Sequence, residues 1–153
     1  MLFLLFQLGG DRYALEAAQV VEVLPLVSIK RIPRAPAGIA GALNYRGAPV
    51  PVIDLNELAT GRPAAARLST RIILVNYIDS GGSRRVLGLI AEQATQMLRR
   101  DPGDFASTGI RPENAPYLGP VVADERGMIQ WVEVNQLLPD PVQNLLFQEP
   151  LPG

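Results

Sequence analysis

The sequence predicts a mainly β fold built from two small β-barrels that pack side by side. Two observations lead to this prediction. Fourteen glycines and 14 prolines divide the 153 residues into short apolar runs, a pattern typical of strands joined by turns. The chain also contains an internal repeat, and two similar small barrels are a natural way to build a repeat of short strands without exposing sheet edges.

The repeat has two parts. When the sequence is compared with itself at a constant offset, Tyr13–Leu24 aligns with Leu87–Leu98, and a slightly larger offset aligns Asp54–Leu58 with Glu133–Leu137. Nearly the same larger offset aligns Arg46-Gly47 with a second Arg-Gly pair, Arg126-Gly127. Each half is therefore expected to repeat the same series of strands, a glycine turn and a short helical turn.

In the first half, four apolar runs bounded by turn residues predict strands at Leu2–Leu8, Arg12–Leu15, Ile39–Tyr45 and Ala48–Leu55. The segment Glu16–Val23 fits either a short helix or a continued strand. Pro49 and Pro51 lie inside the last strand, and proline has no backbone N–H to donate. We therefore expect these two residues at a sheet edge, or with their nitrogens facing away from a neighbouring strand.

In the second half, the same reasoning predicts strands at Thr70–Tyr77, Arg84–Ile90, Leu118–Ala123 and Met128–Val134. Helical turns are expected at Asp54–Leu58, Asn135–Leu138 and Val142–Phe147. The stretch Thr60–Arg67 is the best candidate for a linker. We therefore expect one domain over residues 1–148, with subdomains at about 1–66 and 67–148, and this prediction allows an exchange of strands between them.

Composition excludes several classes of function. The chain contains no cysteine and no histidine, which rules out disulfides, thiolate or histidine metal sites and a Ser-His-Asp triad. A net charge of −1 gives no overall attraction to nucleic acid or to an anionic membrane. The apolar N-terminal run is far shorter than the roughly 20 residues of a membrane span. We expect a cytoplasmic protein with no metal, no cofactor, no nucleic-acid partner and no membrane insertion.

No set of catalytic residues stands out from the sequence. Asp54 and Glu57 are the nearest pair of carboxylates, but Asp54 follows an apolar strand and is better explained as the cap of a helical turn. Trp131 is expected to fill a barrel or to pack against the C-terminal tail. Arg84-Arg85 and Arg99-Arg100 are expected at a solvated rim, because the nine aromatic residues are too scattered for a nucleic-acid surface.

The segment GALNYRGAPVPVIDLNEL, residues 41–58, is the most specific motif in the chain. It resembles the signature of the CheW-like domain, in which a Gly-x-x-Asn-x-Arg-Gly turn is followed by a Pro-Val-Ile-Asp-Leu strand. The upstream segment RYALEAAQVVEVL and the second-half segment VLGLIAEQATQML resemble two further parts of this family. The resemblance extends from Leu4 to about Leu138.

This resemblance implies two five-stranded SH3-like β-barrels and a protein without enzymatic activity. It implies an adaptor that couples chemoreceptors to a CheA-type histidine kinase, by binding the kinase regulatory domain and the cytoplasmic tip of the receptor. Carried over by motif, the residues expected to line a receptor-binding groove are Val20, Val23, Gly41, Ala94, Met97 and Leu98. The residues expected to make polar contacts with the receptor or the kinase are Glu22, Asn44 and Arg46.

The sequence departs from the family pattern at Tyr45, where leucine is usual, and at Glu92, where aspartate is usual. These departures suggest a divergent member that serves a non-flagellar or surface-sensing pathway. Three alternatives stay open at this point. They are a β-barrel module that binds another ligand or nucleic acid, a carboxylate-dependent enzyme that uses Asp54 and Glu57, and a detached regulatory domain of the kinase.

Overall fold

The computed structural model describes residues 1–110 and 112–147. In this part of the chain the strands are β1 (Leu2–Leu8), β2 (Asp11–Glu16), β3 (Val20–Pro25), β4 (Ile39–Tyr45), β5 (Ala48–Asp54), β6 (Arg71–Ile78), β7 (Arg84–Arg99), β8 (Leu118–Asp124) and β9 (Gly127–Val132). The α-helices are α1 (Leu55–Thr60) and α2 (Asp140–Leu146). Three 3₁₀ turns complete the fold: η1 (Ala17–Gln19), η2 (Pro102–Asp104) and η3 (Val134–Gln136). No helix in the described ranges is long and apolar enough to cross a membrane.

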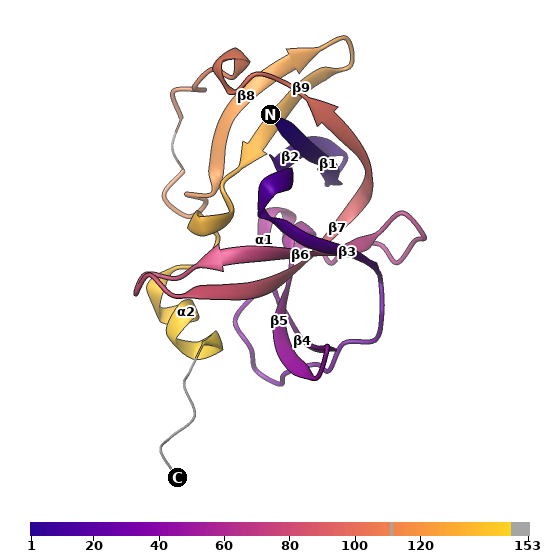
Figure 1. Cartoon of the computed structure of the whole chain (residues 1–153), viewed down its shortest axis with the longest axis vertical. Coiled ribbons are helices and arrows are strands. Elements are labelled where there is room, and N and C mark those ends of the chain that lie inside the picture. The colour runs from indigo at the N-terminus through magenta and orange to yellow at the C-terminus, as the bar shows by residue number, and fades with distance from the viewer. Residues whose placement is uncertain (111, 148–153) are drawn as a thin grey trace.

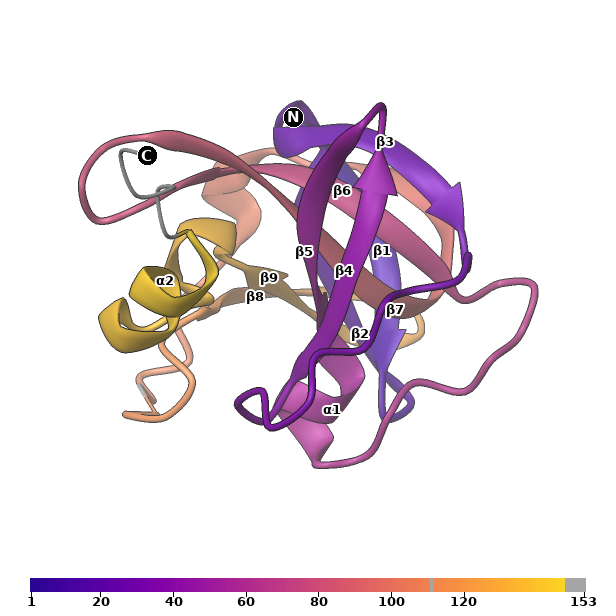
Figure 2. The same ribbon diagram turned by 90° about the horizontal axis from the view of Figure 1, so that it is seen from below.

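The strands form two curled sheets that share β7. In the first sheet the order is β3-β6-β7-β5-β4, and in the second sheet it is β7-β1-β2-β9-β8. Figure 1 shows β4 and β5 at the lower end of the molecule, β8 and β9 at the upper end, and β7 running from one sheet to the other. Figure 2 gives the same arrangement from below, with β4 and β5 towards the viewer.

In each sheet the first and last strands of the order do not pair along their length, so neither barrel is closed. One isolated β-bridge joins the two ends of each sheet. Lys30, just after β3, pairs with Ala42 of β4 in the first sheet. Ala106, after β7, pairs with Val121 of β8 in the second sheet. Each sheet is therefore a five-stranded, partly open barrel.

Strand register shows that the sequence repeat is a structural repeat. Ala14 of β2 lies opposite Trp131 of β9 in a parallel pair, and Gly88 of β7 lies opposite Val52 of β5 in the same way. The two main alignments found in the sequence relate these pairs, since they place Ala14 on Gly88 and Val52 on Trp131. The alignment of the two Arg-Gly pairs is wrong by one position, because the turns enclosed by Tyr45–Ala48 and Asp124–Gly127 place Arg46-Gly47 on Glu125-Arg126.

Alternation along the strands divides the core into three clusters. The first sheet encloses Leu43, Val50, Val52, Ile72, Leu74 and Ile90. The second sheet encloses Phe3, Ala14, Val122 and Ile129. A larger cluster, which we name the seam cluster, lies between the sheets and includes Leu4, Phe6, Leu8, Leu15, Ile73, Val75, Tyr77, Leu87, Leu89 and Ala94. Alternate residues of β1 and β6 enter different clusters, because successive side chains of a strand point to opposite faces.

Most predicted elements are present, with bounds that differ by one or two residues, and two differences are larger. Glu16–Val23 is neither one helix nor one strand, because it contains the last residue of β2, then η1, then the start of β3. The predicted strand Arg84–Ile90 is too short, since β7 continues to Arg99. β7 pairs with β6 as far as Ala91 and with β1 from Glu92 onwards, and the backbone φ of +52° at Gln93 lies next to this change of partner.

The expectation for Pro49 and Pro51 is confirmed. β5 pairs with β4 from Ala48 to Ile53 but pairs with β7 only from Val52 to Asp54. The two prolines therefore lie where β5 has a single neighbour and a missing backbone donor is tolerated.

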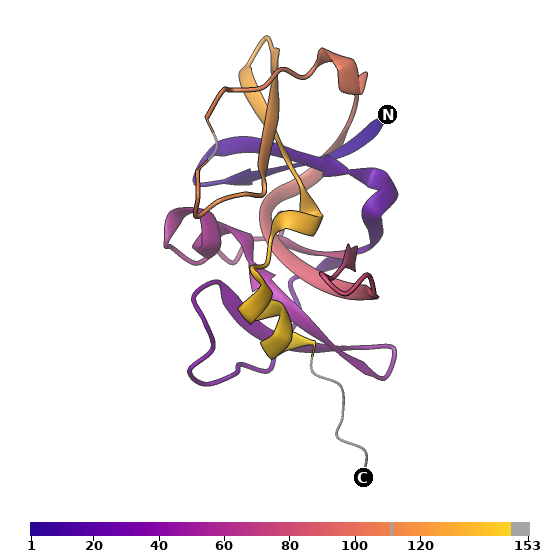
Figure 3. The same cartoon turned by 90° about the vertical axis from the view of Figure 1, so that its left-hand side faces the viewer.

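The C-terminal segment packs against the first sheet. Figure 3 shows η3 and α2 descending from the β8–β9 hairpin to the level of β4 and β5. Gln143 of α2 accepts a hydrogen bond from the backbone N–H of Ser80, at 2.8 Å, and donates one to the carbonyl of Leu138. The Phe147 ring lies 5.8 Å from the Tyr77 ring. These contacts tie the β6–β7 hairpin to the end of the described chain.

Candidate functional site

Two equivalent strands, β3 and the second half of β7, lie at the ends of the two sheet orders. The repeat relates them, and the predicted groove residues lie on both. Val20 and Val23 of β3 are half-buried and pack against the seam cluster. Ala94 of β7 is 1% exposed and belongs to that cluster. The structure thus brings these three residues to the same core, with Val20 and Val23 still partly accessible and Ala94 fully covered.

The other two groove residues on β7 point in different directions. Met97 is 51% exposed and lies opposite Leu4, whose side chain enters the seam cluster. Directly opposed residues share a face of a sheet, so Met97 extends that face to the surface. Leu98 is half-buried and packs against the core of the second sheet. Among the predicted groove residues beside the seam cluster, Met97 and parts of Val20 and Val23 are therefore accessible, and we name these three residues the seam edge.

Gly41 is placed differently from the other predicted groove residues. It is buried in β4, and a Cβ at this position would lie 2.1 Å from the carbonyl oxygen of Lys30. The neighbouring residue, Ala42, exchanges both backbone hydrogen bonds with Lys30 at 2.8 and 2.9 Å. Gly41 therefore allows the close backbone approach that joins the two ends of the first sheet.

The Asn44–Gly47 turn displays Arg46. Arg46 and Gly47 have φ angles of +52° and +85°, the geometry of a tight two-residue hairpin turn. The Asn44 side-chain oxygen accepts a hydrogen bond from the backbone N–H of Gly47 at 2.9 Å, which stabilises the turn. The Arg46 side chain is 79% exposed. The motif asparagine is thus a turn former, and the motif arginine is available for contact.

Glu22 of β3 lies beside this turn. Its Oε2 accepts a hydrogen bond from the Tyr45 hydroxyl at 2.5 Å and lies 3.9 Å from Nη2 of Arg46. The hydrogen bond to Glu22 raises the pKa of the Tyr45 phenol, and burial adds to the rise. The predicted polar contact residues therefore gather at one corner of the first sheet, and Tyr45, which the motif comparison treated only as a departure, joins them.

Of the two carboxylates considered for catalysis, Asp54 is already hydrogen-bonded to the backbone. Asp54 is 6% exposed, and its two oxygens accept hydrogen bonds from the N–H groups of Glu57, at 3.1 Å, and Ala64, at 2.9 Å. Asp54 thus caps α1 and anchors the loop that follows, as the capping interpretation predicts. An acid–base site made of Asp54 and Glu57 requires both carboxyl groups to be accessible, and Asp54 is buried. In the described ranges no group of three or more acidic side chains is placed to hold a metal ion.

Sequence reasoning missed an ion pair across the second sheet. The Arg12 guanidinium on β2 binds both carboxylate oxygens of Asp124 at the end of β8. This contact lowers the pKa of Asp124 well below its usual range, with a further contribution from the backbone N–H of Arg126. The side chains of Arg12 and Asp124 are 13% and 21% exposed, so the pair is partly shielded from water. Its two residues lie 112 positions apart, and no local motif relates them.

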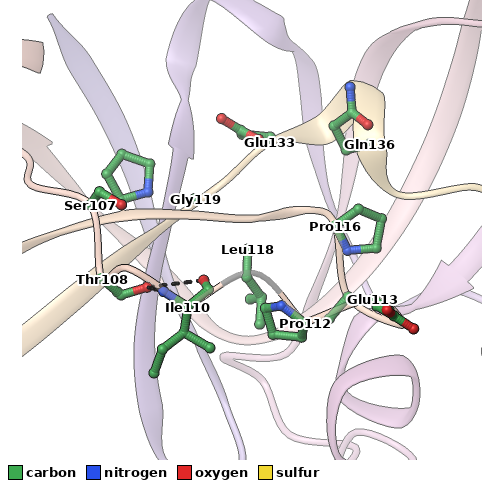
Figure 4. Close-up of a pocket in the computed structure, with 12 residues that line it drawn as sticks. Ser107, Thr108, Ile110, Pro112, Glu113, Pro116, Leu118, Gly119, Glu133 and Gln136 are labelled. Atoms are coloured by element: carbon green, nitrogen blue, oxygen red, sulfur yellow. Dashed lines mark hydrogen bonds between the residues drawn. The ribbon is translucent and has the colours of Figure 1, made fainter.

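A cavity of about 520 Å³ opens on the second sheet, between the loop that precedes β8 and η3. Figure 4 shows its lining, with Glu133 and Gln136 at one end and Glu113 beside Pro112 and Pro116. Thr108 bonds the backbone of Ile110 within the loop, which shapes one wall. None of the residues predicted to contact a partner is among the described residues that line it.

Two related, partly open five-stranded β-barrels that share β7, with Arg46 displayed at one turn, define the class of fold to which this chain belongs. The family model of the CheW-like domain matches residues 2–142. The chain therefore belongs to the CheW-like domain family, and the resemblance noted from its sequence motifs is confirmed.

Several known proteins support this assignment. The chain is 28% identical to the chemotaxis protein CheW of Klebsiella aerogenes over 123 residues, which cover 80% of this chain and 67% of that protein. It is 24% identical to the chemotaxis protein CheW of Bacillus subtilis over 137 residues, covering 88% and 85% of the two chains. The crystal structure of the scaffolding protein TtCheW from Thermoanaerobacter tengcongensis is similar, with a TM-score of 0.77, 25% identity and coverage of 90% and 87%. The predicted mainly β fold with two SH3-like halves is confirmed, with sheets that stay open rather than fully closed.

Proposed function

We propose that this chain is a non-catalytic adaptor that couples chemoreceptor-like proteins to a CheA-type histidine kinase. The CheW-like match over residues 2–142 is the observation that carries the proposal. Named relatives are chemotaxis proteins, and a similar solved structure is described as a scaffolding protein. We place the adaptor in the cytoplasm, at receptor arrays.

The two surfaces described above fit two kinds of contact. The seam edge offers apolar atoms from strands of both sheets, and the apolar face of an amphipathic helix, such as a receptor tip, can pack against accessible apolar side chains of this kind. The Arg46 corner offers a planar guanidinium, which suits a bidentate contact with a carboxylate. The receptor tip is therefore assigned to the seam edge, and an acidic group of the receptor or of the kinase regulatory domain to Arg46.

The division of the domain into halves also belongs to this proposal. Residues 1–66 and 67–148 each carry one copy of the repeat, while β1 and β2 complete the second sheet and the first part of β7 completes the first. An adaptor built in this way exchanges strands between its halves, so neither half is expected to bind a partner alone. That this chain acts in a non-flagellar or surface-sensing pathway remains a prediction, which rests on the differences from the family motif at Tyr45 and Glu92.

The test is binding of the full chain to two purified fragments, the kinase regulatory domain and the receptor tip, measured by calorimetry. Arg46→Ala is expected to weaken one of the two complexes, because it removes an exposed charged contact. Arg126→Ala is the matched control, since Arg126 is an exposed arginine at the equivalent turn of the second sheet. Met97→Asp is expected to weaken the receptor complex without unfolding the protein, because Met97 is half exposed.

The outcomes separate the hypotheses. Binding by the parent that Arg46→Ala or Met97→Asp weakens, and that Arg126→Ala leaves unchanged, supports the adaptor and locates its surfaces. A well-folded parent that binds neither fragment contradicts the proposal.

A further inference from the structure

Tyr45 connects the two ends of the first sheet through its side chain. It is the last residue of β4, and Glu22 lies on β3, so the hydrogen bond between them crosses the gap at which the strand order is open. The Tyr45 ring is partly buried and packs against the core of the first sheet. This packing leaves its hydroxyl at the surface, where it donates to Glu22.

The same tyrosine also contacts Arg46. The guanidinium carbon of Arg46 lies 5.1 Å from the centroid of the Tyr45 ring, within the range of a cation–π contact. Arg46 is otherwise held only loosely, since its Nη2 is 3.9 Å from Oε2 of Glu22 and its side chain is 79% exposed. Tyr45 is therefore the residue that touches both charged groups of this corner.

Glu22 and Arg46 both retain hydrogen-bonding atoms that a partner can use. Glu22 uses Oε2 for the Tyr45 hydroxyl, and no donor from the described residues contacts its Oε1. Arg46 carries five N–H donors, and stacking on a ring leaves their in-plane directions open. The corner thus presents an acceptor and a set of donors side by side.

We propose that Tyr45 is a positioning residue that holds Glu22 and Arg46 as a fixed pair, which selects a partner offering an acidic group for Arg46 beside a donor for Glu22. This inference rests on the proposed adaptor function and adds a specificity determinant to it. A leucine at this position, which the family motif usually has, offers neither a hydroxyl for Glu22 nor a ring face for Arg46. Ordering long side chains before binding reduces the entropy lost in the complex, so the tyrosine favours association.

The test measures the affinity of the full chain for the kinase regulatory domain and for the receptor tip with Tyr45→Phe and Tyr45→Leu. Tyr45→Phe keeps the ring and removes the bond to Glu22. It is expected to weaken the complex that depends on Arg46 measurably, by up to about tenfold, because the bond lies within the protein and its loss reduces affinity by at most its own free energy. Tyr45→Leu is expected to weaken it further, because the ring face is also lost. Tyr13→Phe, at another half-buried tyrosine, is the matched control and should leave affinity unchanged.

A double-mutant cycle distinguishes positioning from simple structural support. In a Glu22→Gln background, Tyr45→Phe should have a smaller effect on affinity than in the parent, because its charge-assisted bond is already weakened. Urea unfolding of each variant shows whether stability has changed. If the parent binds and Tyr45→Phe binds equally well, or if the two substitutions act independently, the inference is overturned while the adaptor proposal stands. If the parent binds neither fragment, both are overturned.

Discussion

Replacing Gly41 with alanine is expected to open the first sheet. The added Cβ would lie 2.1 Å from the carbonyl oxygen of Lys30 and 2.8 Å from its carbonyl carbon, so the backbone must separate. The separation breaks the two hydrogen bonds between Lys30 and Ala42, at 2.8 and 2.9 Å. Two backbone hydrogen bonds contribute about 1–3 kcal/mol to the free energy of unfolding. The φ of +150°, a region populated almost only by glycine, adds about 1–3 kcal/mol of backbone strain.

The expected loss for Gly41→Ala is therefore about 2–6 kcal/mol, a large part of the roughly 5–15 kcal/mol that is typical of a domain. Gly10→Ala is the matched control, because Gly10 has a φ of +89° and a Cβ added there would meet nothing within 4 Å. This control should lose only the strain, about 1–2 kcal/mol.

Urea unfolding followed by circular dichroism measures both variants. With a slope of about 1–3 kcal/mol per molar urea, the midpoint of Gly41→Ala should lie roughly 1 M below that of Gly10→Ala. Equal midpoints for the two variants would refute the claim that Gly41 is required for the close approach of Lys30.

Three further predictions concern other parts of the fold. Phe3→Ala should lower the free energy of unfolding by about 3–5 kcal/mol in urea titrations, because Phe3 is fully buried and contacts the rings of Phe105 and Trp131. Asp54→Ala should lower it by about 1–3 kcal/mol, since two backbone N–H groups lose their acceptor; a loss as small as that of an exposed surface residue would contradict the anchoring role. Asp124 has a folded-state pKa below its ordinary value of 3.8, so its pair with Arg12 stabilises the fold above about pH 4 and this stabilisation declines as the pH falls further. Thermal unfolding between pH 2 and 7 should show a shallower acid decline for Asp124→Asn, and an unchanged decline would contradict this contribution.

Much of the fold can be predicted from local patterns. The predicted strand Ile39–Tyr45 and the turn after it have the bounds that the structure shows, because an apolar alternation ends there at an asparagine and a glycine. The end of β7 cannot be predicted in this way. Beyond Ile90 its sequence becomes polar, yet the strand continues because β1 supplies a new partner from Glu92 onwards.

The candidate site can be predicted in part. The motif places Glu22 and Arg46 in one functional group, and the structure shows them 3.9 Å apart. It also groups Gly41 and Ala94 with the exposed groove residues, whereas both are buried. A motif records which residue types recur and does not record whether a residue contacts a partner or supports the backbone that carries the contact.

The sequence by itself determined the short strands, their turns, the repeat and the family, because turn chemistry and side-chain alternation act over a few residues. The tertiary structure alone decided the sharing of β7 between two sheets, the bond from Tyr45 to Glu22 across 23 positions, and the pair of Arg12 and Asp124 across 112. These contacts depend on the order in which strands pair. Strand order is set by the burial of whole faces against one another, which no local run of residues encodes.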